Sequence, residues 1–244
     1  MPPSTERYKR NMRIAILQCD EVLEKFQPEF GSYVEMIKHM FECIDDTFEF
    51  DSYDCRKEEY PDDLDAYDFF ITTGSRASVY EKDIWIQTLI EFVRRLEREK
   101  RKFIGICFGH QILALAFRTG VEKSEKGWGI GVATNRIVCT PRWMGEQKKN
   151  LNIIVSHQDQ IISLPKEARV IAESDFCPFF MVQWNDHFLS IQGHPEWNRV
   201  YSKTLINERR KLIPQPIVEK GFQSLEKEPD NDCFIRWIID FIKK

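Results

Sequence analysis

The sequence predicts an α/β protein with a mainly parallel central sheet, helices on both faces and an antiparallel β addition. Two observations support this prediction. Short apolar runs alternate with helix-forming segments as far as Phe117, whereas after Gly120 short β-type runs follow one another with few helices between them. Apolar strands joined through helices are typical of parallel sheets covered on both faces, and successive strands joined by turns form antiparallel hairpins.

The half of the chain before Gly120 contains the predicted parallel strands. Four short runs are predicted to be strands: Arg13–Cys19, Thr47–Phe50, Phe69–Thr73 and Phe103–Ile106. Three segments have the apolar spacing of helices: Tyr33–Phe41, Trp85–Lys100 and Gly109–Phe117. The acidic stretch Glu58–Asp68 contains Pro61 and is predicted to be a surface loop.

The half after Gly120 contains the predicted antiparallel addition. A glycine-rich turn is expected at Gly127–Gly131. The expected strands are Ile137–Thr140, Leu151–Val155, Arg169–Ala172, Phe179–Gln183 and Phe188–Gln192. Helices over Val200–Leu212 and Cys233–Lys244 are predicted to close the chain, joined by a segment that contains three prolines.

Length and charge limit the classes of function. A chain of 244 residues fits one large α/β domain, predicted over 13–244 behind a polar, flexible lead-in of residues 1–12. The net charge of −4 offers no electrostatic attraction to nucleic acid or to an anionic membrane, so neither is an expected partner. No apolar run has the length of a secretory signal or of a membrane span.

Seven cysteines are scattered singly along the chain. Their number is odd and no two of them form a CxxC pair, which argues against a disulfide framework and against a zinc site. A reducing, cytoplasmic location is therefore predicted, and neither a metal nor a cofactor is expected.

The segment Gly105-Ile106-Cys107-Phe108-Gly109 combines a nucleophile with flanking glycines where a predicted strand gives way to a helix. A sharp turn at this point forces a strained backbone at Cys107, and glycines let neighbouring backbone approach closely. The thiol would stand at a helix N-terminus, where free N–H groups favour the thiolate. Taken alone, the segment is equally consistent with a buried structural cysteine.

A second segment, Gln192-Gly193-His194-Pro195-Glu196, supplies a histidine and a carboxylate two residues apart after another apolar run. By itself, His194 is better explained as a surface loop histidine beside a turn proline. Together with Cys107, however, His194 and Glu196 form the minimum set for nucleophilic acyl transfer. In such a set the imidazole takes the thiol proton and the carboxylate fixes the imidazole tautomer.

The two segments together resemble the signature of class I glutamine amidotransferases. Between them, the segment 155–159 (VSHQD) resembles a strand end of the stand-alone, GMP-synthase-like branch. Within that branch the chain resembles the γ-glutamyl peptidases of plants and their stand-alone amidotransferase-like relatives in fungi and animals. The resemblance extends to segments 73–75 and 126–131 and, more weakly, to the tail 224–230, so it covers nearly the whole chain from Arg13 onward. It implies a flavodoxin-like fold with a single amidotransferase-like domain over 13–244.

The resemblance also implies the catalytic roles. Cys107, His194 and Glu196 match the nucleophile, the base and the residue that orients the base. The backbone N–H groups of Gly74 and Phe108 match the oxyanion hole, which stabilises the tetrahedral intermediate.

Three further positions match the substrate pocket of the family. Gln111 matches a residue that meets the α-amino and α-carboxylate end of the substrate, and Ser156 and His157 match a strand end that lines the same pocket. Two polar neighbours are predicted to be structural instead. His110 is expected to make a hydrogen bond within the turn, and Asp159 to cap a helix or turn.

The predicted reaction is cleavage of the γ-glutamyl amide of glutamine or of a glutathione-like peptide, through a γ-glutamyl thioester on Cys107. Loops 75–83 and 143–149 are the expected sites of leaving-group selectivity. Two alternatives remain open: a glutaminase subunit that passes ammonia to a separate synthetase, and a non-catalytic interaction module on the same fold. A related branch of stress proteins and intracellular peptidases has histidine after the nucleophile, where this chain has Phe108.

Overall fold

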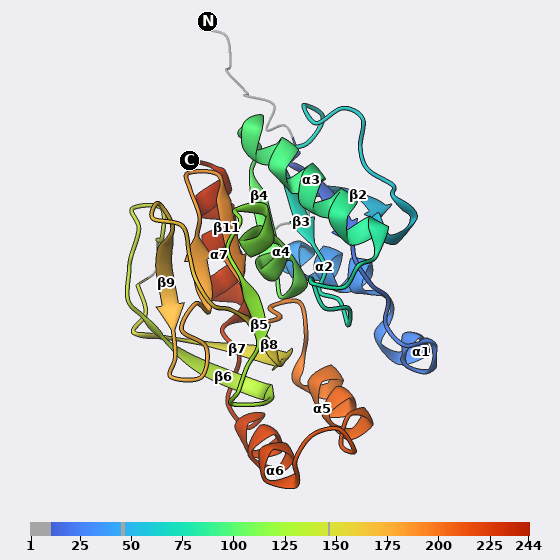
Figure 1. Cartoon of the computed structure of the whole chain (residues 1–244), viewed down its shortest axis with the longest axis vertical. Coiled ribbons are helices and arrows are strands. Elements are labelled where there is room, and N and C mark those ends of the chain that lie inside the picture. Colours follow the sequence, from blue (N-terminus) through green and yellow to red (C-terminus); the bar gives the residue numbers. More distant parts are fainter. Residues whose placement is uncertain (1–10, 45–46, 146) are drawn as a thin grey trace, which may run out of the picture.

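A nine-stranded sheet forms the centre of the computed structural model, which describes residues 11–44, 47–145 and 147–244 (Figure 1). Its strands follow the order β2-β1-β3-β4-β11-β10-β9-β6-β7. The first five are parallel to one another, and the remaining neighbours pair antiparallel. The bounds are β1 Arg13–Gln18, β2 Glu49–Asp54, β3 Phe69–Thr72, β4 Phe103–Ile106, β6 Gly129–Ile137, β7 Asn150–His157, β9 Arg169–Glu173, β10 Met181–Gln183 and β11 Phe188–Ile191.

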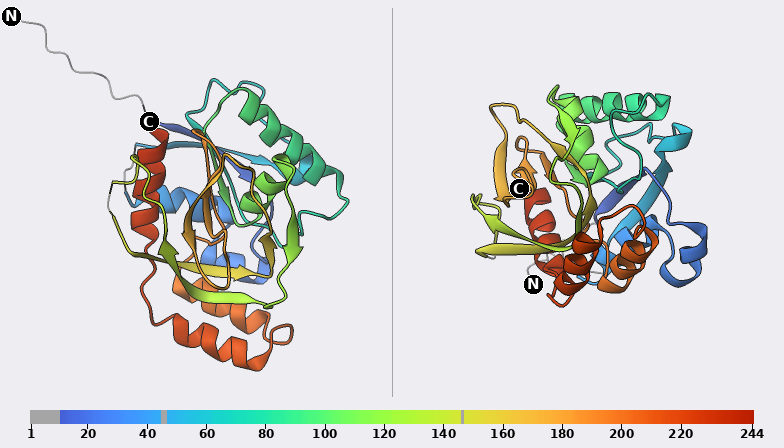
Figure 2. Two further views of the ribbon diagram at one scale, coloured as in Figure 1. Left: turned by 60° about the vertical axis from the view of Figure 1, so that its left-hand side comes forward. Right: turned by 60° about the horizontal axis from the view of Figure 1, so that its bottom comes forward.

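Helices cover both faces of the sheet, which confirms the predicted fold class (Figure 2). One face is covered by α2 (Tyr33–Glu42) and α7 (Asn231–Ile242), and the other by α3 (Ile84–Arg98) and α4 (Phe108–Ala116). Alternate residues of one strand face opposite sides, so that in β1 Ile14 packs in the first core and Ala15 in the second. Burial on both faces is the reason that the central strands are apolar along their length.

The edge strand β2 lies further along the chain than predicted. It spans Glu49–Asp54 instead of Thr47–Phe50 and pairs with β1 at the edge of the sheet. Its sequence, EFDSYD, mixes charged and apolar residues because part of an edge strand is exposed to water. The segment Glu58–Asp68 contains no helix or strand, as predicted.

The glycine-rich segment predicted as a turn is divided: Gly127 closes a turn by donating to the Ser124 oxygen, whereas Gly129 begins β6. The strand predicted from Ile137 onward is wrong because β6 ends there. Gly131, with φ of +78°, lies against α6 (Gln215–Ser224), and a Cβ at this glycine would lie 2.1 Å from Ser224 Oγ. The glycine therefore permits close packing of a helix on a strand.

The α6 helix was predicted as a connection because it follows Pro214 and contains Pro216. Pro216 lies in the first turn, where a helix tolerates proline because the first N–H groups have no partner within the helix. Helices α5 (Arg199–Glu208) and α6 lie beside β6 and β7 at one end of the molecule (Figure 1).

Three smaller elements were also missed. A short helix, α1, spans Gln27–Phe30. Strand β5 (Val121–Lys123) pairs with β8 (Asp159–Ile161) in a separate two-stranded sheet. None of the helices in the described part of the chain is both long and apolar enough to cross a bilayer.

Candidate active site

Cys107 occupies the turn between β4 and α4, with φ of +47° and ψ of −92°. A positive φ is strained for a residue with a side chain, so the predicted strained elbow is confirmed. Both glycines are required by the close approach of strand and helix. A Cβ at Gly105 would lie 2.7 Å from the backbone oxygen of Gly109, and a Cβ at Gly109 would lie 1.8 Å from Thr72 Oγ1.

Replacing Gly109 by alanine is expected to lower the free energy of unfolding by about 3 kcal/mol, because the new methyl group must displace the buried Thr72 side chain. Gly120→Ala is the control. Its Cβ would meet the tip of the Ile162 side chain, which is 50% exposed and free to move. Chemical denaturation of both variants measures the difference, and equal stability of the two variants would contradict the packing argument.

His194 and Glu196 follow β11, which pairs in parallel with β4, so the segments after these strands reach the same edge of the sheet. His194 Nδ1 lies 2.7 Å from Glu196 Oε1. The imidazole stacks on the Trp197 ring with 3.5 Å between centroids and 5° between planes. Both His194 and Cys107 are buried, with 3% and 5% of their surface exposed. The structure thus fixes the imidazole on two sides, by a carboxylate and by an aromatic ring.

The charge of His194 depends on its two neighbours. Burial is the largest influence on the pKa of His194 and lowers it, but the electrostatic and hydrogen-bond interactions with Cys107 and Glu196 together outweigh burial and raise the pKa to about 9. At neutral pH the imidazole therefore carries a proton. A protonated imidazole beside a cysteine favours the thiolate, which is the nucleophilic form of that side chain.

Two glutamines connect Cys107 to the strand β8. Gln192 Nε2 donates to Cys107 Sγ at 3.5 Å, and its Oε1 accepts a hydrogen bond of 3.2 Å from Gln111 Nε2. The same Gln111 nitrogen donates to the backbone oxygen of Asp159 at 2.9 Å. Both amide hydrogens of Gln111 are therefore used inside the protein, which leaves its Oε1 as the acceptor that it can offer to a ligand.

Gly74 and Phe108, the two positions that the resemblance matches to the oxyanion hole, both adjoin Cys107. A Cβ at Gly74 would be 2.6 Å from His194 Cε1 and 3.6 Å from Cys107 Cβ. Phe108 is the first residue of α4, where a backbone N–H has no partner within the helix. Within the described residues, neither the Gly74 N–H nor the Phe108 N–H donates to a backbone oxygen.

A pocket of about 350 Å³ opens onto Cys107. It is lined by Ser75, Arg76, Ala77, Ser78, Tyr80, Cys107, Gln111, Lys123, Trp128, Ser156, His157, Gln158, Asp159, Arg209 and Leu212. Three of these side chains are cationic and one is a carboxylate, so the pocket favours an anionic ligand. A larger adjoining cavity of about 750 Å³ shares Trp128 and His157 with it.

The family model for class I glutamine amidotransferases matches residues 28–208. The chain belongs to this family. Gamma-glutamyl peptidase 2 of Arabidopsis thaliana is 31% identical to it over 96% of this chain and 97% of the relative. Gamma-glutamyl peptidase 4 of the same plant is 35% identical over 82% of this chain and 84% of the relative. A solved glutamine amidotransferase of Thermotoga maritima has a TM-score of 0.75 at 19% identity, covering 96% and 99% of the two chains.

In this amidotransferase chain, Ser156 and His157 both line the pocket at the end of β7, as the resemblance implies. The Ser156 hydroxyl accepts a hydrogen bond from Arg209. The His157 ring is buried, its Nδ1 lies 3.2 Å from the backbone oxygen of Asp159, and burial lowers its pKa to about 4. His157 is therefore neutral at pH 7 and serves as a wall of the pocket.

The two residues predicted to be structural behave differently from each other. His110 Nδ1 is 2.7 Å from Ser190 Oγ, and burial lowers its pKa to about 3, so it is a neutral structural group. Its partner lies in β11 and not within the turn, where it was expected. Asp159 caps no helix. Its carboxylate accepts hydrogen bonds from the hydroxyls of Ser78 and Tyr80, at 2.7 and 3.1 Å, and so ties loop 75–83 to β8.

The expected selectivity loops are placed in two different regions. Loop 75–83 contributes five residues to the pocket wall, in line with the prediction. None of the described residues of the region 143–149 lines the pocket. Trp143 packs on Phe241 of α7 and donates to Gln183, so this expectation is wrong. The sequence marks Trp143 only as a large apolar residue in a loop, which does not distinguish core from pocket.

Sequence reasoning missed Arg209 and Trp197. Arg209 caps α5 and reaches the pocket, where its guanidinium lies 5.9 Å from the centre of the Trp128 ring. No carboxylate in the described part of the chain forms an ion pair with Arg209. Trp197, next to Glu196, supports the His194 ring. Adjacency to the His194 segment was the available signal for Trp197, whereas nothing in the sequence marks Arg209 among its basic neighbours.

Within residues 11–44, 47–145 and 147–244, no three histidine, cysteine or carboxylate side chains gather in an arrangement that could hold a metal ion. None of the seven cysteines forms a disulfide.

Proposed function

We propose that this amidotransferase-family protein hydrolyses γ-glutamyl amides, with Cys107 as nucleophile, His194 as acid and base, and Glu196 as the residue that orients the imidazole. The observation that carries the proposal is the arrangement around Cys107. Cys107 is strained at a helix N-terminus, the His194 imidazole lies with it against Gly74, and His194 Nδ1 lies 2.7 Å from the buried Glu196 carboxylate. This is the arrangement that nucleophilic acyl transfer requires.

The first half of the reaction forms a thioester. The Cys107 thiolate attacks the γ-carbonyl carbon, and the carbonyl oxygen takes the negative charge. The N–H groups of Gly74 and Phe108 are proposed to stabilise that oxyanion, since neither donates to a backbone oxygen of the described chain. The C–N bond then breaks as the His194 imidazolium protonates the leaving amine, and the γ-glutamyl group remains on sulfur.

The second half releases glutamate. His194, now neutral, takes a proton from water, and the resulting hydroxide attacks the thioester carbon. The C–S bond breaks, the thiolate leaves with its electron pair, and the product acid ionises. His194 is again protonated beside a thiolate, which restores the starting pair.

The pocket supports an amino acid γ-amide as substrate. Gln111 Oε1 is free to accept from an α-ammonium group, and Arg209 offers a positive charge to a carboxylate. The relatives at 31% and 35% identity are named gamma-glutamyl peptidases, which favours γ-glutamyl peptides over free glutamine as substrates. We also propose a cytoplasmic location, supported by the observation that none of the seven cysteines is joined in a disulfide.

A panel of glutamine, glutathione and other γ-glutamyl peptides tests the proposal, with glutamate release as the measurement. The purified chain is expected to release glutamate from γ-glutamyl peptides without a partner protein. Release only after a synthetase is added would favour the glutaminase-subunit alternative. No release from any donor, with or without a partner, would favour a non-catalytic module on this fold.

A further inference from the structure

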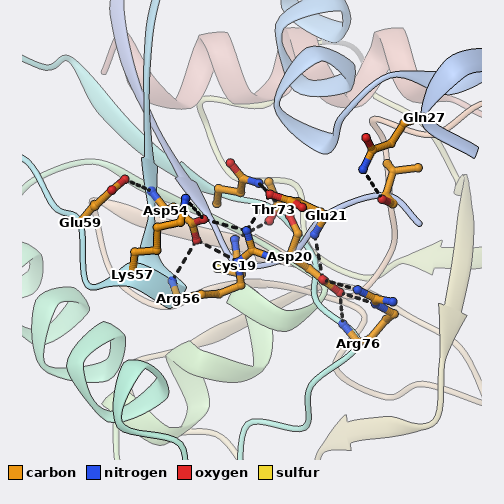
Figure 3. A network of polar contacts seen from close by, with 12 residues as sticks. Cys19, Asp20, Glu21, Gln27, Asp54, Arg56, Lys57, Glu59, Thr73 and Arg76 are labelled. Atoms are coloured by element: carbon orange, nitrogen blue, oxygen red, sulfur yellow. Dashed lines mark hydrogen bonds and ion pairs between the residues drawn. The ribbon is translucent and has the colours of Figure 1, made fainter. Parts of the chain in front are cut away.

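Asp20 lies in the loop after β1 and binds Arg76 in the segment that follows β3 (Figure 3). Its Oδ2 accepts from the backbone N–H and the Nε of Arg76, at 2.9 and 2.8 Å, and its Oδ1 accepts from Arg76 Nη2 at 2.7 Å. A fourth hydrogen bond comes from the N–H of Glu21 at 2.8 Å. The carboxylate therefore fixes both the main chain and the side chain of Arg76.

A second contact holds the same segment at Thr73, three residues before Arg76. The backbone N–H of Cys19, next to Asp20, donates to Thr73 Oγ1 at 2.8 Å, and that hydroxyl donates to the carbonyl oxygen of Gly74 at 2.9 Å. Gly74 and Ser75 thus lie between two residues, Thr73 and Arg76, that are both hydrogen-bonded to the loop after β1. The peptide orientation at Gly74 follows from these two attachments.

The backbone of Gly74 has little room to move. A Cβ at this glycine would be 2.6 Å from His194 Cε1, so the backbone of Gly74 lies directly against the imidazole. A displacement of the segment 73–76 would move the Gly74 N–H relative to the Cys107 sulfur. A shift of about 1 Å in a group that stabilises a transition state can slow a reaction by about 100-fold.

We propose that Asp20 is a positioning residue that, through Arg76, sets the orientation of the Gly74 N–H toward the oxyanion. The inference rests on the proposed function, because it assigns a purpose to the Gly74 N–H. Asp20 itself does not line the pocket that opens onto Cys107. It therefore acts through the backbone and is expected to affect the rate of the chemical step rather than the binding of substrate.

Asp54 provides a matched control in the same network (Figure 3). Its side chain is 8% exposed, as is that of Asp20, and it also forms ion pairs with basic residues, Arg56 and Lys57. It ends β2, the neighbour of β1. The one relevant difference is that the Asp54 carboxylate binds Arg56 and Lys57 and makes no hydrogen bond or ion pair with the segment 73–76. Asp54→Asn thus reproduces the loss of a buried charge without the loss of the Gly74 attachment.

The experiment compares Asp20→Asn with Asp54→Asn on the full chain, using the best γ-glutamyl donor. Two rates are measured: steady-state hydrolysis, and alkylation of Cys107 by iodoacetamide, followed by mass spectrometry. Alkylation displaces iodide at a saturated carbon and creates no oxyanion, so it reports on the Cys107–His194 pair alone. Asp20→Asn is expected to lower kcat by about 10- to 100-fold with little change in KM and in the alkylation rate. Asp54→Asn is expected to change none of them.

The inference is overturned if Asp20→Asn has the same kcat as Asp54→Asn, or if its alkylation rate falls in proportion to kcat, because the whole site would then be disturbed. Asp20→Glu, which keeps the charge but shifts it by one methylene group, is expected to lie between wild type and Asp20→Asn. If Asp20→Asn does not fold, the kcat and the alkylation rate of Asp20→Glu are compared with those of Asp54→Asn instead. Wild-type protein that is alkylated at Cys107 but hydrolyses no γ-glutamyl donor would refute the proposed function, and the inference with it.

Discussion

Replacing Cys107 by serine is expected to lower kcat for γ-glutamyl hydrolysis by about 10⁶-fold, and His194→Ala to have a comparable effect, since nucleophile and base act as a unit. The serine hydroxyl is a far weaker nucleophile than the thiolate that His194 stabilises. Glutamate release under saturating substrate gives kcat for each variant. Double replacement should cost no more than either single change, because one lost component already disables acyl transfer.

Cys177→Ser is a suitable control for that prediction. Cys177 is buried near the site and lines the adjoining cavity, but burial raises its pKa to about 12, which keeps it a neutral thiol. Its replacement is expected to leave kcat unchanged, and iodoacetamide is expected to label Cys107 well before Cys177. Full activity in Cys107→Ser, or loss of activity in Cys177→Ser alone, would contradict the assignment of the nucleophile.

The second large effect is expected from Glu196→Gln, which should lower kcat by about 10⁴-fold. Glutamine keeps the shape of the side chain but removes the negative charge that stabilises the imidazolium, and it leaves the choice of tautomer open. The effect is smaller than that of Cys107→Ser because the nucleophile and the proton acceptor both remain. A kcat within the error of wild type would show that the carboxylate only fills space.

The pH profile of Glu196→Gln tests the direction in which Glu196 shifts the pKa of His194. In the wild type the pKa of His194 is raised to about 9, so the imidazolium that protonates the leaving amine is lost, and kcat/KM is expected to fall, as pH rises through about 9. Glu196 contributes part of that upward shift, and removing it lowers the pKa of His194. The fall in rate should therefore begin at a lower pH in Glu196→Gln. An unchanged profile would contradict this coupling.

The parallel half of the fold could be predicted because burial on both faces makes its strands continuously apolar. Phe103–Ile106 is the clearest case, and its bounds agree with those of β4. The sequence failed where burial is partial or where glycine and proline have more than one use. The charged edge strand β2 gave a weak pattern, Gly131 suggested a turn although it admits a helix against β6, and Pro216 suggested a connection although it begins α6.

The residues of the site likewise fall into those that a local pattern predicts and those that it does not. Cys107, His194 and Glu196 lie in two short segments whose chemistry is legible without coordinates, and the structure brings them to one sheet edge. Arg209 and Asp20 could not be found in this way. Each makes a contact with a residue far away in the sequence, Arg209 with Ser156 and Asp20 with Arg76. No local sequence pattern predicts such a pairing.

The most direct test of the central claim is to stop turnover of a γ-glutamyl peptide with acid and to examine the protein by mass spectrometry after digestion. The proposed mechanism predicts that the peptide containing Cys107 gains the mass of one γ-glutamyl group. It also predicts that hydroxylamine removes this group, as expected for a thioester, and that Cys107→Ser shows no such gain. Glutamate release with the γ-glutamyl group on another residue, or undiminished in Cys107→Ser, would contradict the account.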